Sequence, residues 1–199
     1  MTSEVVHATA ADSSAVAITL AKAFVDDPVK LFMCGGRSLA IEQVAPFFAA
    51  FQKIQRAHGH VYRTARSEAA AIWAPPGEWK VPARQIARHL PTFAKLYGRR
   101  TLANIGVLSQ LERRHPAAPH YYLEFIGTDP DHQGKGFATA LIRPIVEQAD
   151  LEGVGMYLES SKESNVAFYA RFGFEVREEL TLRRNGPPVW LMWRQPIGG

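Results

Sequence analysis

The chain has 199 residues, of which 47% are hydrophobic and 21% carry a charge, a balance that is typical of a soluble folded protein and excludes a disordered one. Its length suits a single domain, and no apolar run approaches the ~20 residues that a membrane helix needs. One cysteine, Cys34, excludes an intramolecular disulfide, and the first residues lack the basic and apolar segments of a signal peptide. We therefore expect a cytoplasmic protein with no membrane partner.

Hydrophobic periodicity predicts alternating strands and helices along the chain. The first helix is expected to follow the capping residue Ser13 and to end before Pro28, because a residue that precedes proline avoids the α region. The expected elements are, in order, a strand over 5–9, this helix, a helix over 39–57, strands over 61–64 and 69–73, one or two helices over 82–97 and 101–114, a strand over 121–128, a helix over 136–151, a strand over 156–160, a helix over 164–171, and strands over 175–179 and 189–193. This order predicts an α/β domain with a mixed sheet.

The net charge of +4 is unevenly distributed. Between residues 79 and 119 one acid, Glu112, is accompanied by eight basic residues: Lys80, Arg84, Arg88, Lys95, Arg99, Arg100, Arg113 and Arg114. This region is interpreted either as a solvated helix face or as a surface that attracts an anionic ligand. Nucleic acid is not expected as a partner, because aromatic residues are not interleaved with these charges as stacking platforms.

A glycine-containing turn occupies residues 133–138, between the apolar run 121–127 and the helix expected to begin at Gly136. The start of a helix offers unpaired backbone N–H groups and the positive end of a dipole, which favour an anion. Glycine leaves that backbone accessible and permits positive φ. The spacing matches neither a P-loop nor a Rossmann turn. The sequence therefore predicts a phosphate-binding turn of a different kind.

The pattern Gln-x-x-Gly-x-Ala at 133–138 resembles the pyrophosphate loop of the GNAT superfamily of N-acetyltransferases. Further segments fit the same family in order and spacing: Tyr-Tyr-Leu at 121–123, Gly-Thr-Asp-Pro-Asp-His before the loop at 127–132, Tyr-Leu-Glu-Ser at 157–160, Asn-Val-Ala-Phe-Tyr at 165–169 and Phe-Gly-Phe at 172–174. Together they cover about residues 120–179. The chain looks most similar to the puromycin N-acetyltransferase group, although residues 1–119 match only in layout.

The resemblance implies an α/β fold of the GNAT type, an acyl-CoA N-acyltransferase fold. Its twisted, mixed and mostly antiparallel sheet is flanked by helices, and acetyl-CoA lies where strands 4 and 5 splay apart. It also implies one domain over residues 1–199. Residues 1–119 would form the variable acceptor-side half, with inserted helices at about 80–114, and residues 120–199 the half that binds acetyl-CoA.

The resemblance further assigns residues to acetyl-CoA, which is expected as co-substrate, with no metal. The strand edge before the turn would pair with the pantetheine arm, the turn would hold the pyrophosphate through backbone N–H groups, and a later helix would contact the pantetheine amides. Lys135 either adds a charge at the rim or is simply solvated. The implied residues are Ile126, Gly127, Thr128, Gln133, Gly134, Lys135, Gly136, Phe137, Ala138, Thr139, Asn165 and Phe168.

Tyr169 is the residue that the resemblance implies as general acid. It follows Asn165 by four residues, so the two lie on the same helix face. A phenol with a pKa near ~10 can donate a proton to a thiolate of similar basicity. The structural alternative is a core tyrosine that packs ahead of the Phe-Gly-Phe turn at 172–174.

The sequence leaves three candidates for the general base: Glu124, Glu159 and a chain of water molecules. Strand alternation places His120, Tyr122 and Glu124 on one face, with Tyr121, Leu123 and Phe125 on the other. A glutamate in so apolar a strand is costly to bury without a purpose, and desolvation would raise its pKa toward that of a base. Glu159 on the adjoining strand is the competing carboxylate, and it would either orient the amine or anchor the residues that follow it.

Other chemistry-bearing residues are given structural interpretations. Cys34 has no neighbouring histidine in the sequence, so a packing role is favoured over an acetyl-cysteine step. His58 and His60 lack a carboxylate or cysteine that would complete a metal site. Trp73 and Trp79 flank a proline-rich loop and either pack or line the acceptor pocket.

The function expected from the resemblance is transfer of an acetyl group from acetyl-CoA to a primary amine of a small molecule, by direct attack in a ternary complex. The alternatives are acetylation of a protein N-terminus or lysine, and a non-catalytic acyl-CoA sensor. The basic inserted region disfavours polycationic acceptors such as aminoglycosides. Monomer and homodimer both remain open.

Overall fold

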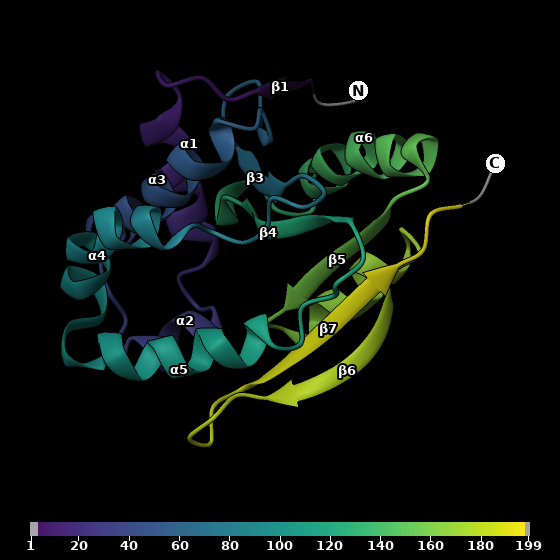
Figure 1. Cartoon of the computed structure of the whole chain (residues 1–199). Coiled ribbons are helices and arrows are strands. Elements are labelled where there is room, and N and C mark those ends of the chain that lie inside the picture. Colours follow the sequence, from purple (N-terminus) through teal and green to yellow (C-terminus); the bar gives the residue numbers. More distant parts are fainter. Residues whose placement is uncertain (1–3, 198–199) are drawn as a thin grey trace.

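The computed structural model describes residues 4–197. Figure 1 shows the helices and strands arranged around one twisted sheet. Within the described residues the elements are β1 (Val5–His7), α1 (Ser13–Ala23), α2 (Pro28–Met33), α3 (Ile41–Arg56), β2 (Val61–Thr64), β3 (Ala69–Ala74), α4 (Ala83–Tyr97), α5 (Thr101–Glu112), β4 (His120–Thr128), α6 (Phe137–Glu152), β5 (Gly155–Ser160), α7 (Val166–Ala170), β6 (Glu175–Thr181) and β7 (Pro188–Arg194). Short 3₁₀ turns occupy Gly98–Arg100, Pro130–His132 and Glu163–Asn165. None of the described helices has the length and apolar content that a membrane crossing requires.

Every strand and helix predicted from periodicity is present, and helix α2 is an addition. Pro28 was expected only to stop the preceding helix, yet it begins a new one. The carboxylate oxygen Oδ1 of Asp27 accepts a hydrogen bond of 2.7 Å from the N–H of Lys30, which caps the new helix. Proline is well suited to a first helical position, because its missing N–H would be unpaired there in any case.

The sheet has the strand order β1-β2-β3-β4-β5-β7-β6. Strands β4 and β5 are parallel, and the other neighbouring pairs are antiparallel. The parallel pairing runs from His120 opposite Gly155 to Leu123 opposite Leu158 and then ends, although both strands continue. The predicted mixed, mostly antiparallel sheet with splayed fourth and fifth strands is therefore confirmed.

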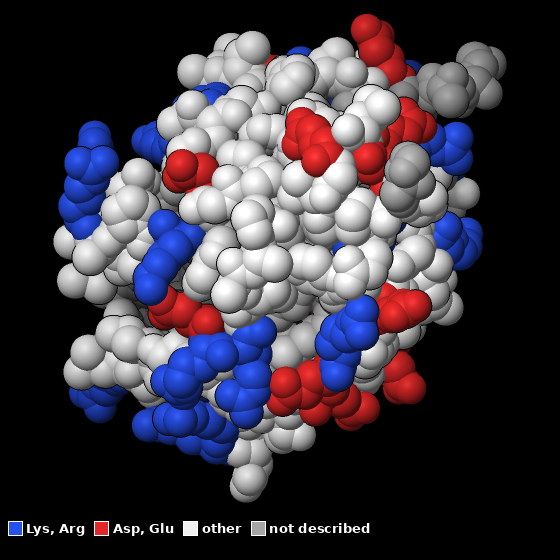
Figure 2. Space-filling view, turned by 45° about the vertical axis from the view of Figure 1, so that its right-hand side comes forward, with Lys and Arg blue, Asp and Glu red and all other residues white. Residues whose placement is uncertain are grey.

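The basic region of the sequence includes α4, α5 and the segments beside them, and its α-helical Lys and Arg residues all lie in α4. Figure 2 shows Lys and Arg side chains gathered at the lower left of one face, next to acidic side chains. Two of the basic residues form exposed ion pairs, Lys80 with Glu112 at 2.9 Å and Arg114 with Glu178 at 3.2 Å. Exposed pairs of this kind stabilise a fold by only about 0–1 kcal/mol.

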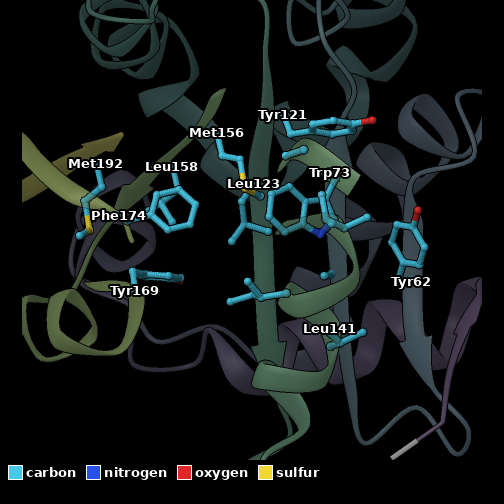
Figure 3. Packing of buried hydrophobic residues seen from close by; sticks show 14 of the residues in the cluster. Tyr62, Trp73, Tyr121, Leu123, Leu141, Met156, Leu158, Tyr169, Phe174 and Met192 are labelled. Carbon is cyan, nitrogen blue, oxygen red and sulfur yellow. The ribbon is translucent and has the colours of Figure 1, made fainter. Parts of the chain in front are cut away.

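Helices α6 and α7 cover one face of the sheet. Their core, drawn in Figure 3, contains side chains from β2, β3, β4, β5, β7, α6 and α7 and includes Trp73, which is fully buried. Trp73 therefore packs in the core and does not line a pocket. On the other face, α1 and α3 cover β2 and β3 around Phe48 and Ile72, while Val107 of α5 packs over β5, β6 and β7.

A close helix–strand contact explains one of the glycines. A Cβ atom at Gly127 would lie 2.5 Å from the Cβ of Ala23 in α1, which is closer than two carbon atoms can approach. Glycine at this position lets α1 lie directly against β4. This contact brings the end of β4, and the turn that follows it, into a fixed position against the N-terminal half of the chain.

A β-bulge in β4 changes the faces that simple alternation predicts. Ile72 lies opposite Phe125 and the next residue, Trp73, lies opposite Leu123, which leaves Glu124 as an extra residue. Glu124 and Phe125 therefore both face α3, where Glu124 contacts a glutamine and Phe125 packs against phenylalanines. The prediction that Phe125 shares a face with Leu123 was wrong, because a bulge interrupts the two-residue period.

Candidate active site

Two carboxylates lie where β4 and β5 separate. Glu124 directly follows Leu123 and Glu159 directly follows Leu158, the last residues that the two strands pair. Oε2 of Glu159 accepts a hydrogen bond of 3.0 Å from the hydroxyl of Tyr122, and Oε1 accepts one of 3.2 Å from Tyr157. Strand pairing explains this arrangement, because Tyr122 and Tyr157 are register partners and their side chains lie on the same face.

Burial perturbs both carboxylates. It raises the pKa of Glu124 to about 8, a rise that the hydrogen bond from Gln55 opposes and the charge of Glu159 reinforces. Burial also raises the pKa of Glu159, against the hydrogen bonds from its two tyrosines. Among the described residues, neither glutamate has a lysine or arginine partner. The site is thus a pair of half-buried acids with no counter-charge from the described residues.

Gln55 of α3 holds Glu124 in place, and it had no role in the sequence prediction. Its Nε2 donates a hydrogen bond of 2.9 Å to Oε1 of Glu124. The remaining oxygens of the two groups, Oε1 of Gln55 and Oε2 of Glu124, are buried and have no hydrogen-bond partner. Buried polar atoms without partners are rare in folded proteins, so these two oxygens indicate a place where a donor from elsewhere belongs.

The glycine turn at 133–138 has the backbone that the sequence predicted. Gly134 and Gly136 adopt φ values of +75° and +81°, and Gly136 directly precedes α6. The first backbone hydrogen bond into this helix runs from the N–H of Ala140 to the carbonyl of Gly136 at 3.0 Å. Within the described residues, the N–H groups from Gly134 to Thr139 have no acceptor. They form a continuous set of donors that suits a phosphate group.

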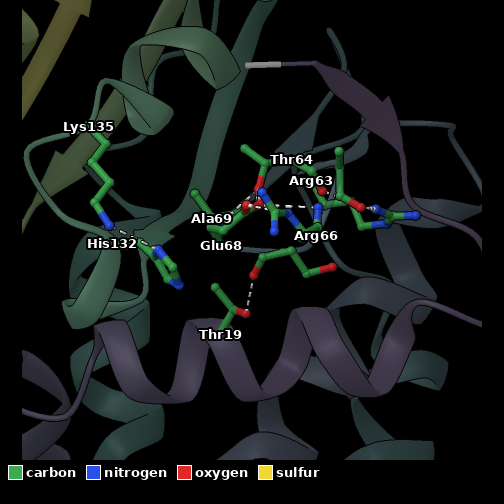
Figure 4. Close-up of polar contacts among 10 residues, drawn as sticks. Thr19, Arg63, Thr64, Arg66, Glu68, Ala69, His132 and Lys135 are labelled. Carbon is green, nitrogen blue, oxygen red and sulfur yellow. Dashed lines mark hydrogen bonds and ion pairs between the residues drawn. The ribbon is translucent and has the colours of Figure 1, made fainter.

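Lys135 lies at the edge of this turn. Its Nζ donates a hydrogen bond of 3.1 Å to the carbonyl of Asp131 and lies 3.3 Å from Nδ1 of His132, as Figure 4 shows for the histidine. The side chain is therefore folded back over the preceding residues and leaves the backbone N–H groups of the turn uncovered.

Tyr169 approaches the diverging strands from the opposite face. It belongs to the core beneath α6 and α7 with Leu158, whereas Tyr157 and Glu159 point to the other side of β5. Burial raises the pKa of Tyr169, and its hydroxyl makes no hydrogen bond within residues 4–197. Asn165 lies just before α7, and Phe168 packs edge-on against Tyr169 with ring centroids 5.2 Å apart.

His115, which lies just after α5 and had no role in the sequence prediction, contacts the two tyrosines that hold Glu159. His115 stacks on Trp79 at a centroid distance of 3.7 Å, and its Nε2 lies 2.9 Å from Nε2 of His120. The His115 ring also meets Tyr122 and Tyr157 edge-on, each at 4.7 Å. Burial lowers the pKa of His115 to about 3, so this ring is neutral at physiological pH.

The remaining candidates lie apart from the carboxylates. Cys34 is fully buried at the end of α2, where burial raises the pKa of its thiol, so it is a packing residue. Across the part of the chain that the structure describes, no group of histidine, cysteine or acidic side chains has a metal-binding arrangement. His60 instead lies beside Tyr62 and Tyr121 as an aromatic packing partner.

A mixed seven-stranded sheet in which the parallel neighbours β4 and β5 stop pairing before either strand ends has the fold of a GNAT acetyltransferase. The acetyltransferase (GNAT) family profile matches residues 59–174, and the chain belongs to this family.

Similar proteins extend the comparison over nearly the whole chain. An uncharacterized N-acetyltransferase of Schizosaccharomyces pombe is 30% identical over 204 residues, which cover 94% of this chain and 81% of the relative. A crystal structure from Corynebacterium glutamicum, described as histone acetyltransferase HPA2 and related acetyltransferase, superposes with a TM-score of 0.76 at 23% identity over 100% and 99% of the two chains. The structure of a polyamine N-acetyltransferase of Drosophila melanogaster, which catalyses the formation of N-acetylagmatine, superposes with a TM-score of 0.65 at 13% identity. The match covers 96% of this chain and 99% of that chain. The two structures show a shared fold.

Proposed function

We propose that the protein transfers an acetyl group from acetyl-CoA to a primary amine of a small molecule, by direct attack in a ternary complex. The observation that carries the proposal is the half-buried and desolvated pair Glu124 and Glu159, which has no counter-cation among the described residues and lies where β4 and β5 part. Unpaired buried charge is costly, so a site built this way is suited to receive an ammonium group.

Acetyl-CoA fits the turn before α6. The unpaired N–H groups from Gly134 to Thr139 would hold the pyrophosphate, because they are donors without acceptors at the positive end of a helix. The backbone of Ile126, Gly127 and Thr128 and the side chains of Asn165 and Phe168 would contact the pantetheine arm. Bound there, acetyl-CoA supplies the activated acetyl thioester. We further propose that residues 120–199 form this half of a single cytoplasmic domain and that residues 1–119 form the acceptor side.

Glu124 is proposed as the general base. Its raised pKa allows it to accept the proton that an ammonium group must lose before the nitrogen attacks the thioester carbon. Glu159, held by two tyrosines, is proposed to orient the amine rather than to take its proton. The new bond joins nitrogen to the acetyl carbon, the carbon–sulfur bond breaks, and the nitrogen loses its second proton to solvent as the tetrahedral intermediate collapses.

Tyr169 is proposed as the general acid that protonates the departing sulfur. It lies on the face opposite the carboxylates, so the base and the acid would meet the thioester from two sides. Burial raises its pKa and therefore keeps the phenol protonated at neutral pH, ready to donate. This position favours catalysis over a non-catalytic sensor, which would have no use for a separated acid and base.

Thiol release tests the proposal directly. Acetyl-CoA is incubated with the protein and a set of small primary amines, peptides with free N-termini and lysine peptides, and free CoA is measured with a thiol reagent. Release that depends on a small amine supports the proposal, and release only with peptides supports the alternative. Binding of acetyl-CoA without release on any amine would indicate the sensor.

Replacement of Gly136 with valine is expected to weaken acetyl-CoA binding at least about tenfold, because valine disfavours φ near +81° and would distort the donors of the turn. Gly153→Val is the matched control. Gly153 ends the same helix at φ +65°, and at both glycines the position that a Cβ atom would take has no neighbouring atom within 4 Å, so the two substitutions impose similar strain. Equal loss of affinity in both variants, measured by calorimetry, would contradict the assignment of the turn.

A further inference from the structure

We propose that the acceptor is a primary monoamine with an aromatic or other flat apolar group, and that Gln55 and the phenylalanines beside it select this amine. The inference rests on the proposed function. It adds a substrate class and two groups of specificity-determining residues to a site whose acceptor is otherwise undefined.

Glu124 and Gln55 would receive the ammonium end of the acceptor. Glu124 is held by Gln55 and repelled by Glu159, and the pair has no lysine or arginine within the described residues. The buried oxygens Oε2 of Glu124 and Oε1 of Gln55 each lack a donor. An ammonium group brings one positive charge and three N–H donors. It therefore supplies both the counter-charge for the carboxylates and the hydrogen-bond donors for the two unpaired oxygens.

Phenylalanine rings form the surface beside Glu124 and Gln55. Phe47, Phe51 and Gln55 are spaced by four residues along α3, so they form one stripe that faces β4. The ring of Phe125, next to Glu124 in the bulge, lies 5.2 Å from Phe51 and 5.7 Å from Phe47. Phe93 of α4 adds a ring 6.2 Å from Phe51.

All four of these rings keep part of their surface accessible, in contrast to the fully buried core around Trp73. An apolar or aromatic group attached to the amine would therefore meet a wall of ring edges and faces directly beside the carboxylate. Ile86 and Leu90 of α4, which are about half exposed, lie on the same helix face as Phe93 by their spacing.

The same surface disfavours a second positive charge. Helix α4, which contributes Phe93 to the wall, contains no acidic residue. The distal ammonium of a diamine or polyamine would therefore lie among apolar rings without a counter-charge from this helix, which is unfavourable. The carboxylate pair therefore serves one ammonium group, and the remainder of the acceptor is apolar.

The test compares amines by their kcat/KM values with saturating acetyl-CoA. The probes are 2-phenylethylamine, n-butylamine, putrescine and spermidine. We expect 2-phenylethylamine to exceed putrescine and spermidine at least about tenfold. Phe51→Leu keeps an apolar side chain and should reduce the value for 2-phenylethylamine several-fold more than that for n-butylamine.

Gln55→Met tests the ammonium end, and Gln52→Met is its matched control. Both glutamines are fully buried in α3, but the amide of Gln52 donates to the carbonyl of Ser13 and not to Glu124. Gln55→Met, but not Gln52→Met, should raise KM for every amine and displace the pH dependence of kcat/KM. KM for acetyl-CoA should be unchanged in both variants. Thermal unfolding of both variants identifies any loss that comes from instability alone.

The outcomes separate the two proposals. A preference for 2-phenylethylamine that Phe51→Leu removes supports the inference. Acetylation of putrescine or spermidine as efficiently as 2-phenylethylamine, or equal effects of Gln55→Met and Gln52→Met, would overturn it and leave the acetyltransferase assignment intact. Failure of every amine, with acetyl-CoA bound, would overturn the proposed function and the inference together.

Discussion

Glu124→Gln is expected to lower kcat/KM for amine acetylation by about 10²- to 10⁴-fold, the usual contribution of a positioned general base. The substitution keeps the size of the side chain and resembles the neutral, protonated acid, so the packing around Gln55 should be retained. The measurement is steady-state thiol release at saturating acetyl-CoA. A thermal unfolding temperature no lower than that of the wild type is the control that assigns the loss to chemistry.

The pH dependence gives this prediction a second readout. A base acts in its deprotonated form, and burial raises the pKa of Glu124 to about 8, so wild-type kcat/KM should increase as the pH rises through about 8 and level off above it. Glu124→Gln should remove this inflection. Glu159→Gln should reduce activity and keep an inflection, displaced to lower pH because the charge of Glu159 contributes to the raised pKa of Glu124. The reverse result would identify Glu159 as the base and refute the assignment given to Glu124.

The same raised pKa affects stability. In the unfolded chain Glu124 titrates near its ordinary pKa of 4.5, whereas the folded protein retains the proton up to about pH 8. Between these values the folded state binds more protons than the unfolded state, so the contribution of Glu124 to stability is complete below pH 4.5 and is lost as the pH rises through about 8. Glu124→Gln, which cannot ionise, should lose this pH dependence.

The sequence contained most of the fold because its local signals agree with one another. Alternation, helical spacing and turn residues indicated each element of the sheet, and the spacing of Gly134 and Gly136 indicated a turn with positive φ and exposed N–H groups. Helix α2 was missed because proline has two opposite effects. It ends a helix that precedes it and begins one that follows, and the capping role of Asp27 decides between them.

The site was predictable only where it depends on neighbours in the sequence. The bulge at Glu124 depends on the register between β3 and β4, and the pairing of Tyr122 with Tyr157 depends on where β5 joins β4, so neither can be read from one strand. Gln55 lies 69 residues before the carboxylate that it contacts. A polar residue at the end of an apolar helical stripe was its only local signal.

Tyr169→Phe is expected to lower the rate of the chemical step by about 10²- to 10⁴-fold while leaving acetyl-CoA affinity nearly unchanged. The hydroxyl makes no hydrogen bond within residues 4–197, so its removal leaves no partner unsatisfied and should not destabilise the core. Tyr62→Phe is the matched control. Tyr62 is buried to a similar extent in the same core, at 8% exposure against 7%, but it lies on β2 away from the diverging strands.

A single-turnover measurement is the appropriate readout for Tyr169→Phe, because slow product release would hide a change in chemistry. Loss of the phenol should slow acetyl transfer most for substrates in which departure of the sulfur limits the rate. A thioester with a more acidic thiol leaving group needs less protonation, so it should restore part of the lost rate in Tyr169→Phe and change the wild type little. If Tyr169→Phe and Tyr62→Phe turned over at the wild-type rate, Tyr169 would be a packing residue and the proton for the sulfur would have another source.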